Sequence, residues 1–389
     1  MVNLTFVPNA VLFMRLKLNK IELKGYKSVN GDGQLLPINE DVTVLIGANG
    51  VGKSNVVSFF QMLGYAMSGS LQNYVGENGF ADSFLYYGSK TTDCIKAKLF
   101  FASEDSKNEY FFRLAYAAGD SLVFTEEMLS FKKKGSLKPF KLTLDAGKKE
   151  SQLYEAKDSE YKDAVQVLID FLQNCRYFQF HDTTKEAKIR KNGYIGDNKY
   201  LRSNAGNLAA FLYGIKNQKG GEPYYNRIVR YIRQVMPQFG DFIMEPSVMD
   251  PNYISLDWRE QNSDYIFSVN QISDGTLRFI ALTTLLLQPA KSMPSLIVID
   301  EPELGLHPAA ISILAGMIKK ASETSQVVLA TQSPELLDQF SADKVVVVER
   351  DEARRTSVFR KLSCKELKEW EAEYTTSELW EKNVIGGRP

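Results

Sequence analysis

The feature that most constrains the fold is the segment from Gly47 to Ser54, GANGVGKS, which matches the pattern G-x-x-x-x-G-K-[ST]. A β-branched, uncharged run at residues 42–46 precedes it, and an apolar segment with helical spacing follows it. A strand, a glycine-rich turn and a helix are the context in which this pattern binds phosphate. The sequence therefore predicts an α/β fold in which a buried parallel strand ends in a phosphate-binding turn.

The residue types of this loop suit the polyphosphate of ATP. Gly50 and Gly52 let backbone N–H groups approach phosphate oxygens without a Cβ in the way, and the next helix directs its positive end to the same place. Lys53 would reach the β- and γ-phosphates, and the Ser54 hydroxyl would bind Mg²⁺. The alternative is a chance glycine-rich turn, which would not need the flanking strand and helix. The predicted cofactors are ATP and Mg²⁺, and the predicted nucleotide contacts are Asn49, Gly50, Gly52, Lys53, Ser54 and Asn55.

A second buried strand is predicted just before Asp300 and Glu301, in the segment SLIVIDEPELGLHP. The two carboxylates would then stand at the edge of the sheet where the phosphate loop lies. Asp300 would hold Mg²⁺ through water, and Glu301 would orient and deprotonate the attacking water. The alternative is that both acids only cap the following helix.

Ser-Asp-Gly at residues 273–275 precedes an apolar helix and offers a hydroxyl, a free N–H and a positive helix end. One phosphate loop does not need two such anion sites, but two copies of the chain facing each other do. Ser273 and Gly275 would then contact the γ-phosphate that the other copy holds. The alternative is an ordinary helix cap.

A third buried strand, in QVVLATQSPELLD, is predicted to end at Thr331 and Gln332. Ligands sit at strand ends in open α/β sheets, so Gln332 is placed to touch the γ-phosphate or the attacking water. The predicted catalytic residues are therefore Glu301, Gln332 and Lys53.

The order of these motifs resembles the ABC-type ATPase heads of the RecF and SMC class. More closely, the chain from about Arg15 resembles the compact RecF-like ATPases of bacteria that are often described as AAA family ATPases. The stretches that carry the resemblance are IELKGYKSV, LIGANGVGKSN, YFQFHDT, NLAAFLY, ISDGTLRF, VIDEPELGLHP, TQSPELLD and ELWEKNVIGGRP. The resemblance implies a mostly parallel sheet flanked by helices, with an inserted antiparallel β lobe, a short helical lobe and no long coiled coil.

The same resemblance implies roles for single residues. It gives nucleotide and metal binding to the phosphate loop, the catalytic base to Glu301, and contacts across a dimer to Ser273 and Gly275. A polar residue in YFQFHDT would link the γ-phosphate to lobe movement, and His181 is favoured over Gln179; the alternative is a strand end with no role. His307 is either an interface residue or an ordinary surface histidine.

Two departures from the pattern bear on activity. Gln332 stands where a histidine is usual, and a neutral amide implies slow hydrolysis. Ser-Asp-Gly-Thr stands where transporters have Ser-Gly-Gly-Gln, which disfavours a transporter ATP-binding subunit.

The motif spacing divides the chain into five predicted parts. These are a possible N-terminal extension (1–13), the phosphate-loop half of the head (14–90), the inserted β lobe (91–180), the helical lobe (181–260), and the Ser-Asp-Gly and Asp-Glu half of the head with a C-terminal hairpin and helix (261–389). The roughly fifty residues after the third strand leave no room for a nuclease domain, so a controlled nuclease would be another protein.

Composition limits the partners and the location. Lys plus Arg equals Asp plus Glu at 47 each, so DNA contact would need a local patch. Basic runs at residues 132–134 and 185–191, and arginines at 227, 230 and 233, are such candidates; the alternative is a solvated surface. Dispersed cysteines and apolar runs too short for a bilayer predict a cytoplasmic protein with no membrane contact.

Together these features predict an ATPase switch that dimerises around ATP and controls DNA or a separate nuclease or effector, in phage defence or DNA repair. The alternatives are an ATP-dependent dimeric scaffold with little turnover and, less consistent with the motifs, a transporter subunit.

Overall fold

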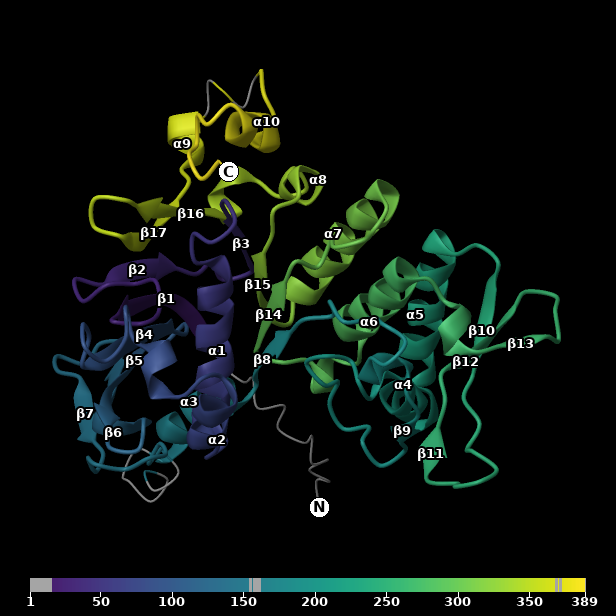
Figure 1. Cartoon of the computed structure of the whole chain (residues 1–389), viewed down its shortest axis with the longest axis horizontal. Coiled ribbons are helices and arrows are strands. Elements are labelled where there is room, and N and C mark those ends of the chain that lie inside the picture. Colours follow the sequence, from purple (N-terminus) through teal and green to yellow (C-terminus); the bar gives the residue numbers. More distant parts are fainter. Residues whose placement is uncertain (1–15, 154–155, 157–161, 368–369, 371–372, 389) are drawn as a thin grey trace, which may run out of the picture.

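A computed structural model describes residues 16–153, 156, 162–367, 370 and 373–388. The predicted extension, residues 1–13, lies outside this part of the chain, as do some residues of the predicted C-terminal acidic helix. Figure 1 shows an antiparallel β lobe on one side, a central sheet, and a mainly helical lobe on the other side.

The central sheet has the strand order β17-β16-β3-β15-β14-β8. All neighbours are parallel except β17, which closes the edge as an antiparallel hairpin with β16. Every residue of β3, β14 and β15 is buried, as expected of uncharged β-branched runs covered on both faces. The strands are β3 (Val42–Ile46), β8 (Cys175–Phe178), β14 (Leu296–Asp300), β15 (Gln326–Ala330), β16 (Val345–Asp351) and β17 (Thr356–Lys361).

The β lobe is a six-stranded antiparallel sheet with the order β2-β1-β4-β5-β6-β7. Its strands alternate buried and partly exposed residues, which is the pattern of a sheet with one wet face. The strands are β1 (Lys17–Lys24), β2 (Gln34–Pro37), β4 (Cys94–Ala102), β5 (Ser106–Ala117), β6 (Ser121–Lys133) and β7 (Phe140–Thr143). Strands β1 and β2 thus join the predicted meander, whereas β8, at the end of the segment assigned to this lobe, belongs to the central sheet.

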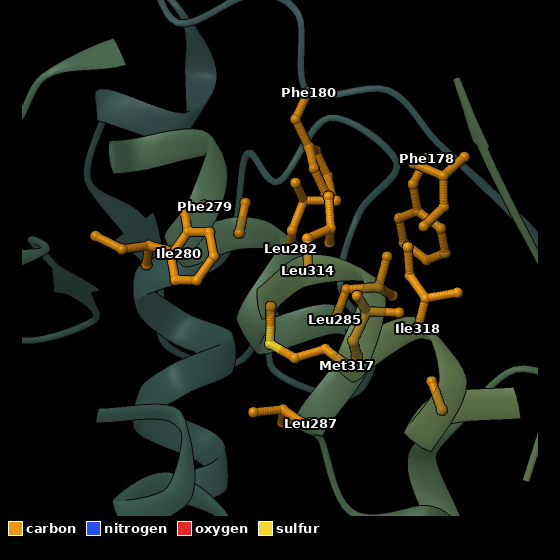
Figure 2. Close-up of a cluster of buried hydrophobic side chains, with 14 of the residues drawn as sticks. Phe178, Phe180, Phe279, Ile280, Leu282, Leu285, Leu287, Leu314, Met317 and Ile318 are labelled. Carbon is orange, nitrogen blue, oxygen red and sulfur yellow. The ribbon is translucent and has the colours of Figure 1, made fainter. Parts of the chain in front are cut away.

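Helices separate and cover the two sheets. One hydrophobic core joins one face of the central sheet to the β lobe through α1 (Lys53–Met67), α2 (Leu71–Glu77) and α3 (Lys162–Gln173). A second core joins the opposite face to α4 (Leu208–Asn217), α5 (Glu222–Val235), α6 (Asp274–Leu287) and α7 (Pro308–Ser322). Figure 2 shows this second core, where side chains of α6 and α7 such as Leu282 and Leu314 meet Phe178 and Phe180.

Short elements complete the helical lobe and the C-terminal region. The lobe carries small sheets made of β9 (Gly193–Tyr194), β10 (Phe239–Ile243), β11 (Tyr253–Ile254), β12 (Asp257–Glu260) and β13 (Ile266–Phe267). The C-terminal helices are α8 (Pro334–Leu337), α9 (Cys364–Leu367) and α10 (Thr376–Glu381). The longest described helices, α1 and α7, have 15 residues, so the expected absence of a long coiled coil holds for this part of the chain. In the same part, no helix combines the length and apolarity needed to cross a bilayer.

The C-terminal segment folds back onto the phosphate loop. Trp380 donates its ring N–H to the carbonyl of Gly387 at 2.9 Å, and Gly387 donates its own N–H to Glu349 at 2.8 Å. A Cβ built on Gly387 would lie 3.5 Å from the Cα of Gly47. The segment around Gly387 therefore lies close to the start of the nucleotide-binding turn.

Candidate functional site

The phosphate loop connects the end of β3 to the start of α1, as the sequence predicts. Gly47 and Gly52 have φ values of 155° and 117°, which disfavour any residue with a side chain. A Cβ on Gly52 would lie 2.3 Å from Oγ of Ser357 and 2.7 Å from Oγ of Ser28. Glycine is thus required at Gly52 by both conformation and space.

Lys53 lies in the interior of this loop. Its ammonium group donates to the carbonyls of Gly47 at 2.6 Å and Ala48 at 2.7 Å, and the residue is 5% exposed. Burial lowers the pKa of Lys53, while the nearby carboxylates of Glu301 and Asp300 act in the opposite direction. The lysine and the two acids therefore share one electrostatic environment, although they come from distant parts of the sequence.

The other predicted nucleotide contacts of the loop differ in exposure and in the hydrogen bonds that they already make. Asn49 and Gly50 are exposed at the tip of the turn, and Ser54 is exposed in the first turn of α1. Asn55 instead donates its side-chain amide to Oγ of Ser28 at 2.8 Å. Asn55 is thus engaged within the protein, and its predicted nucleotide contact would use other atoms.

The carboxylates of Asp300 and Glu301 stand at the end of β14. Asp300 is 7% exposed, and burial raises its pKa, as does the neighbouring Glu301, while His181 acts to lower it. Glu301 adopts the left-handed conformation, with φ of 44°, and donates its backbone N–H to the carbonyl of Ala330 at 2.8 Å. Such a conformation is costly for a residue with a side chain and turns the chain sharply at this point.

Two neighbours from two further strand ends lie against the carboxylate of Glu301, and a third, Gln179, contacts one of them. Gln332 donates its amide to Oε1 of Glu301 at 3.0 Å. Nε2 of His181 lies 3.8 Å from Oε2 of Glu301 and 3.2 Å from the carbonyl oxygen of Asp300. The side chain of Gln179 lies 3.1 Å from Nδ1 of His181. The structure thus brings together Glu301, Gln332 and both candidates that the sequence offered beyond β8.

The chain of contacts continues to Tyr177, whose hydroxyl donates to Oε1 of Gln179. Since that bond occupies the amide oxygen of Gln179, its NH₂ group faces His181 as a donor. Nδ1 of His181 is then the acceptor, and Nε2 carries the hydrogen that points to the Asp300 carbonyl. The side chains from Tyr177 to Glu301 therefore form one directed path into the site, defined here as the β8 relay: Tyr177, Gln179 and His181.

Oxygen donors suited to Mg²⁺ are present in this group. Ser54 offers a hydroxyl. Asp300 offers a buried carboxylate, and a bound cation would offset the cost of burying its negative charge. Among the described residues, no set of three or more His, Cys, Asp or Glu side chains forms a closed metal site. Mg²⁺ in nucleotide sites takes one or two protein ligands together with phosphates and waters.

The Ser-Asp-Gly turn forms the start of α6. Ser273 caps the helix, accepting the N–H of Thr276 at 3.2 Å and donating to its hydroxyl at 2.8 Å. A Cβ on Gly275 would lie 2.3 Å from the carbonyl oxygen of Gly305, so glycine allows close contact with the loop after Glu301. Helix α6 packs in the core on one face of the central sheet, and α1 packs in the core on the opposite face. The contacts of Ser273 and Gly275 with a nucleotide thus stay a prediction.

Comparison with known proteins agrees with this geometry. Residues 42–338 match the family described as "AAA domain, putative AbiEii toxin, Type IV TA system". The chain belongs to this AAA-domain family. No curated protein matches it. The match spans the phosphate loop, the Ser-Asp-Gly turn and both acidic strand-end residues.

Solved structures show the fold of the AAA domain. An SMC head bound to the C-terminal winged-helix domain of ScpA has a TM-score of 0.55 at 16% identity, over 91% of this chain and 99% of that one. A Pyrococcus furiosus SMC head with an extended coiled coil, bound to the C-terminal domain of ScpA, has a TM-score of 0.54 at 16% identity, over 92% and 99%. Together with the family match, these structures confirm the predicted RecF- and SMC-like head fold.

Glu303 is a site residue of the AAA domain that sequence reasoning missed. Its Oε1 accepts the hydroxyl of Thr331 at 2.6 Å and the backbone N–H of Gln332 at 3.2 Å. Burial raises the pKa of Glu303, whereas the bond from Thr331 acts in the opposite direction. The signal was its position two residues after Glu301, which places it on the turn that faces the end of β15.

Two arginines of the AAA domain connect the segments that surround the site. Arg190 is 8% exposed and donates to the carbonyls of Thr183 at 2.8 Å, Val269 at 2.7 Å and Ile272 at 3.1 Å, and to the carboxylate of Asp274 at 2.7 Å. It fixes the Ser-Asp-Gly turn to the segment beyond His181. The sequence offered this arginine as a DNA contact, but its donors are used internally.

Arg278 links the turn to the β8 relay. It donates to the carbonyls of Phe180 at 3.1 Å, His181 at 2.8 Å and Leu304 at 3.3 Å. His307, in the same loop as Leu304, is exposed and caps α7 by accepting the N–H of Ala309 at 3.3 Å. The loop after Glu301, the relay and α6 are thus connected in one network.

The remaining basic surface is smaller than the sequence indicates. Arg233 donates to the carbonyls of Phe239 and Gly240, so it serves to join α5 to β10. Arg230 and the lysines at 132–134 are exposed. Exposed cations therefore remain on two separate lobes, and the DNA contact stays a prediction.

Proposed function

We propose that this chain is an ATP-hydrolysing switch in which two copies face each other around two ATP molecules. The observation that carries the proposal is that Gln332 donates to Glu301 and His181 lies 3.8 Å from the same carboxylate, beside Lys53. An attacking water needs an acceptor for its proton, and the γ-phosphate needs donors for its developing charge. This group supplies both.

In the proposed reaction each residue has one task. Lys53 exchanges its loop carbonyls for β- and γ-phosphate oxygens, to which it is a stronger donor because they are charged. Glu301 orients the water and accepts its proton, and Gln332 fixes the carboxylate. Bound Mg²⁺, held by Ser54 and Asp300, would neutralise phosphate charge. Because Gln332 is neutral, we expect slow turnover.

We propose that Ser273 and Gly275 act on the nucleotide held by the other copy. The helix that they begin packs on the opposite face of the central sheet from the helix after the phosphate loop, which supports a γ-phosphate contact through a second chain. The exposed Leu304 and His307 lie in the loop between Glu301 and α7, and Arg278 joins this loop to the relay. A partner copy that displaces this loop would thus change the position of Glu301.

We further propose that the switch holds or releases a nucleic acid or a separate nuclease or effector in the cytoplasm. The family description names a toxin of a toxin–antitoxin system, which supports a protein partner and a role in phage defence over one in DNA repair.

The alternative is an ATP-locked dimeric scaffold with little turnover. It is favoured by one observation, the uncharged Gln332 as the donor to Glu301. A transporter subunit has less support, because Ser-Asp-Gly-Thr departs from the transporter pattern.

The deciding experiment measures ATP hydrolysis per chain against protein concentration, with and without duplex DNA, with Glu301→Gln as the blank. A rate that rises with concentration supports catalysis across a dimer, and a further rise with DNA supports a nucleic-acid partner. A rate equal to that of Glu301→Gln at every concentration refutes the hydrolytic switch and leaves the scaffold.

A further inference from the structure

A groove of about 930 Å³ lies beside β8, at the edge of the central sheet. Its walls are the C-terminal half of α1, the end of α3, all of β8, and residues 197–204 and 291–292. On α1 the wall begins at Phe60, roughly 9 Å along the helix axis from Ser54 at 1.5 Å per residue. The groove is therefore separate from the phosphate loop but built on the same helix.

The charged residues of the groove favour an anionic ligand. Its cations are Arg176, Lys199, Arg202 and Lys291. Arg202 is paired with Asp197 at 2.6 Å. The other acid of the lining, Asp170, accepts the amide of Gln166 at 2.6 Å. Among the described residues, none of the remaining three cations forms an ion pair, so the groove keeps an excess of positive charge.

Arg176 and Lys199 are held in place over an aromatic ring. The guanidinium of Arg176 lies 4.8 Å from the ring centroid of Tyr200, and Nζ of Lys199 lies 5.2 Å from it. Nε of Arg176 is buried, and no hydrogen-bond acceptor meets it within the described part of the chain. The guanidinium thus lies over the Tyr200 ring, and its charge has no acidic partner among the described residues.

Tyr65 gives the groove a flat aromatic wall. Tyr74 stacks against it, with ring centroids 4.8 Å apart and an interplanar angle of 22°, while Tyr65 remains 36% exposed. One face of the Tyr65 ring is therefore supported and the residue lines the groove. A supported aromatic ring beside cations is the combination that binds a base together with its phosphate.

We propose that this groove binds a nucleotide, with its base stacked on Tyr65 and its phosphate held by Arg176 and Lys199. A free mononucleotide and the unpaired end of a nucleic-acid strand present the same chemistry, and the experiment below distinguishes them. The volume suits either source, since small-ligand sites span about 300–1,000 Å³.

The groove also connects to the catalytic group, and this part of the inference rests on the proposed function. Tyr177 lines the groove and starts the β8 relay, which ends at the carbonyl of Asp300 and beside Glu301. A ligand that shifts Tyr177 would therefore reorient His181. The groove would then act as an effector site that changes the rate of ATP hydrolysis.

The binding test uses a Lys53→Ala background, so that the phosphate loop does not contribute. The probes are N-methylanthraniloyl-AMP for the free nucleotide and 5′-phosphorylated, 3′-fluorescein-labelled trithymidylate for the strand end, each titrated by fluorescence anisotropy. We expect Arg176→Gln to weaken binding about tenfold, and Tyr65→Leu to weaken it by a similar factor, as expected for loss of base stacking. Tyr65→Phe keeps the ring and should bind normally, which separates stacking from misfolding.

The matched control is Arg202→Gln, which removes a cation that is already paired with Asp197 and should change binding less than twofold. The probe that binds more tightly identifies the source of the nucleotide. Equal losses in the Arg176 and Arg202 variants, or no binding of either probe below 1 mM, would overturn the site.

The coupling test measures ATP hydrolysis by the unaltered chain with saturating probe. We expect at least a twofold change in rate, which Tyr177→Phe abolishes because it removes the donor to Gln179. Probe binding with an unchanged rate overturns the coupling and retains the site. If the chain hydrolyses no ATP at all, the proposed function fails, while the binding result in the Lys53→Ala background is unaffected.

Discussion

The side-chain amide of Gln332 lies 3.0 Å from a carboxylate oxygen of Glu301, although the two residues follow different strands. The pairing places a neutral donor, not a cation, on the proposed catalytic base. We therefore expect Gln332→Ala to lower kcat about tenfold with little change in ATP affinity, because general-base effects act on the chemical step. Steady-state kinetics and ATP titration would separate the two. Equal losses in kcat and affinity would contradict this role.

Glu303 should make folding stability depend on pH. Its pKa is raised in the folded state, so the folded state binds more protons than the unfolded state between the ordinary glutamate pKa of about 4.3 and the raised value. Stability should therefore fall as pH rises through that window. Urea unfolding of Glu303→Gln across this range should show a smaller fall than the unaltered chain. A parallel pH profile in both proteins would show that Glu303 is not the group responsible.

Gly275→Ala should disturb the contact between α6 and the loop after Glu301. The new Cβ would lie 2.3 Å from the carbonyl oxygen of Gly305, and relieving such overlap costs about 1–3 kcal/mol. Gly316→Ala is the matched control, because Gly316 is exposed within α7 and a Cβ there meets nothing within 4 Å. The control should gain up to about 1 kcal/mol from helix propensity. Thermal unfolding of both variants measures the difference, and similar midpoints would refute the close contact.

Arg190→Ala should destabilise the chain by about 3 kcal/mol, because it leaves buried carbonyls of Thr183, Val269 and Ile272 without their donor. Asp274→Ala removes only the partly exposed partner of the same arginine and should cost less. Lys191→Ala, at an exposed neighbouring position, is the control. Urea unfolding midpoints give the ranking. An Arg190 variant as stable as the Lys191 variant would show that the internal hydrogen bonds of Arg190 contribute little.

The strands and helices around the nucleotide site were predictable because their periodicity is strong. Uncharged runs ending in Gly47, Asp300 and Thr331 fit buried parallel strands, and each one is found in the central sheet. Strand β8 was harder to assign, because four residues carry little periodicity and its partner β14 lies far along the sequence. Its place in the sheet is set by tertiary packing.

Some polar residues of the site could likewise be located from the sequence, and others could not. Glu301 and Gln332 follow buried strands, so a sequence rule locates them. Glu303 and Arg190 gain their surroundings from segments distant in sequence, and charge patterns alone indicated solvent or DNA for the arginine. The spacing of the sequence motifs thus predicts which strand ends form the site. The hydrogen bonds that Glu303 and Arg190 make there depend on how distant segments pack in the folded chain.

The contact between Gly387 and Gly47 has a consequence for biosynthesis. Strand β16 and Gly387, which lie beside β3 and the phosphate loop, are translated long after that loop. Domains of a nascent chain fold as their segments emerge. The nucleotide site therefore acquires these neighbours only after β16 and Gly387 have been translated, and nascent fragments that stop before β16 would not present the finished site to ATP.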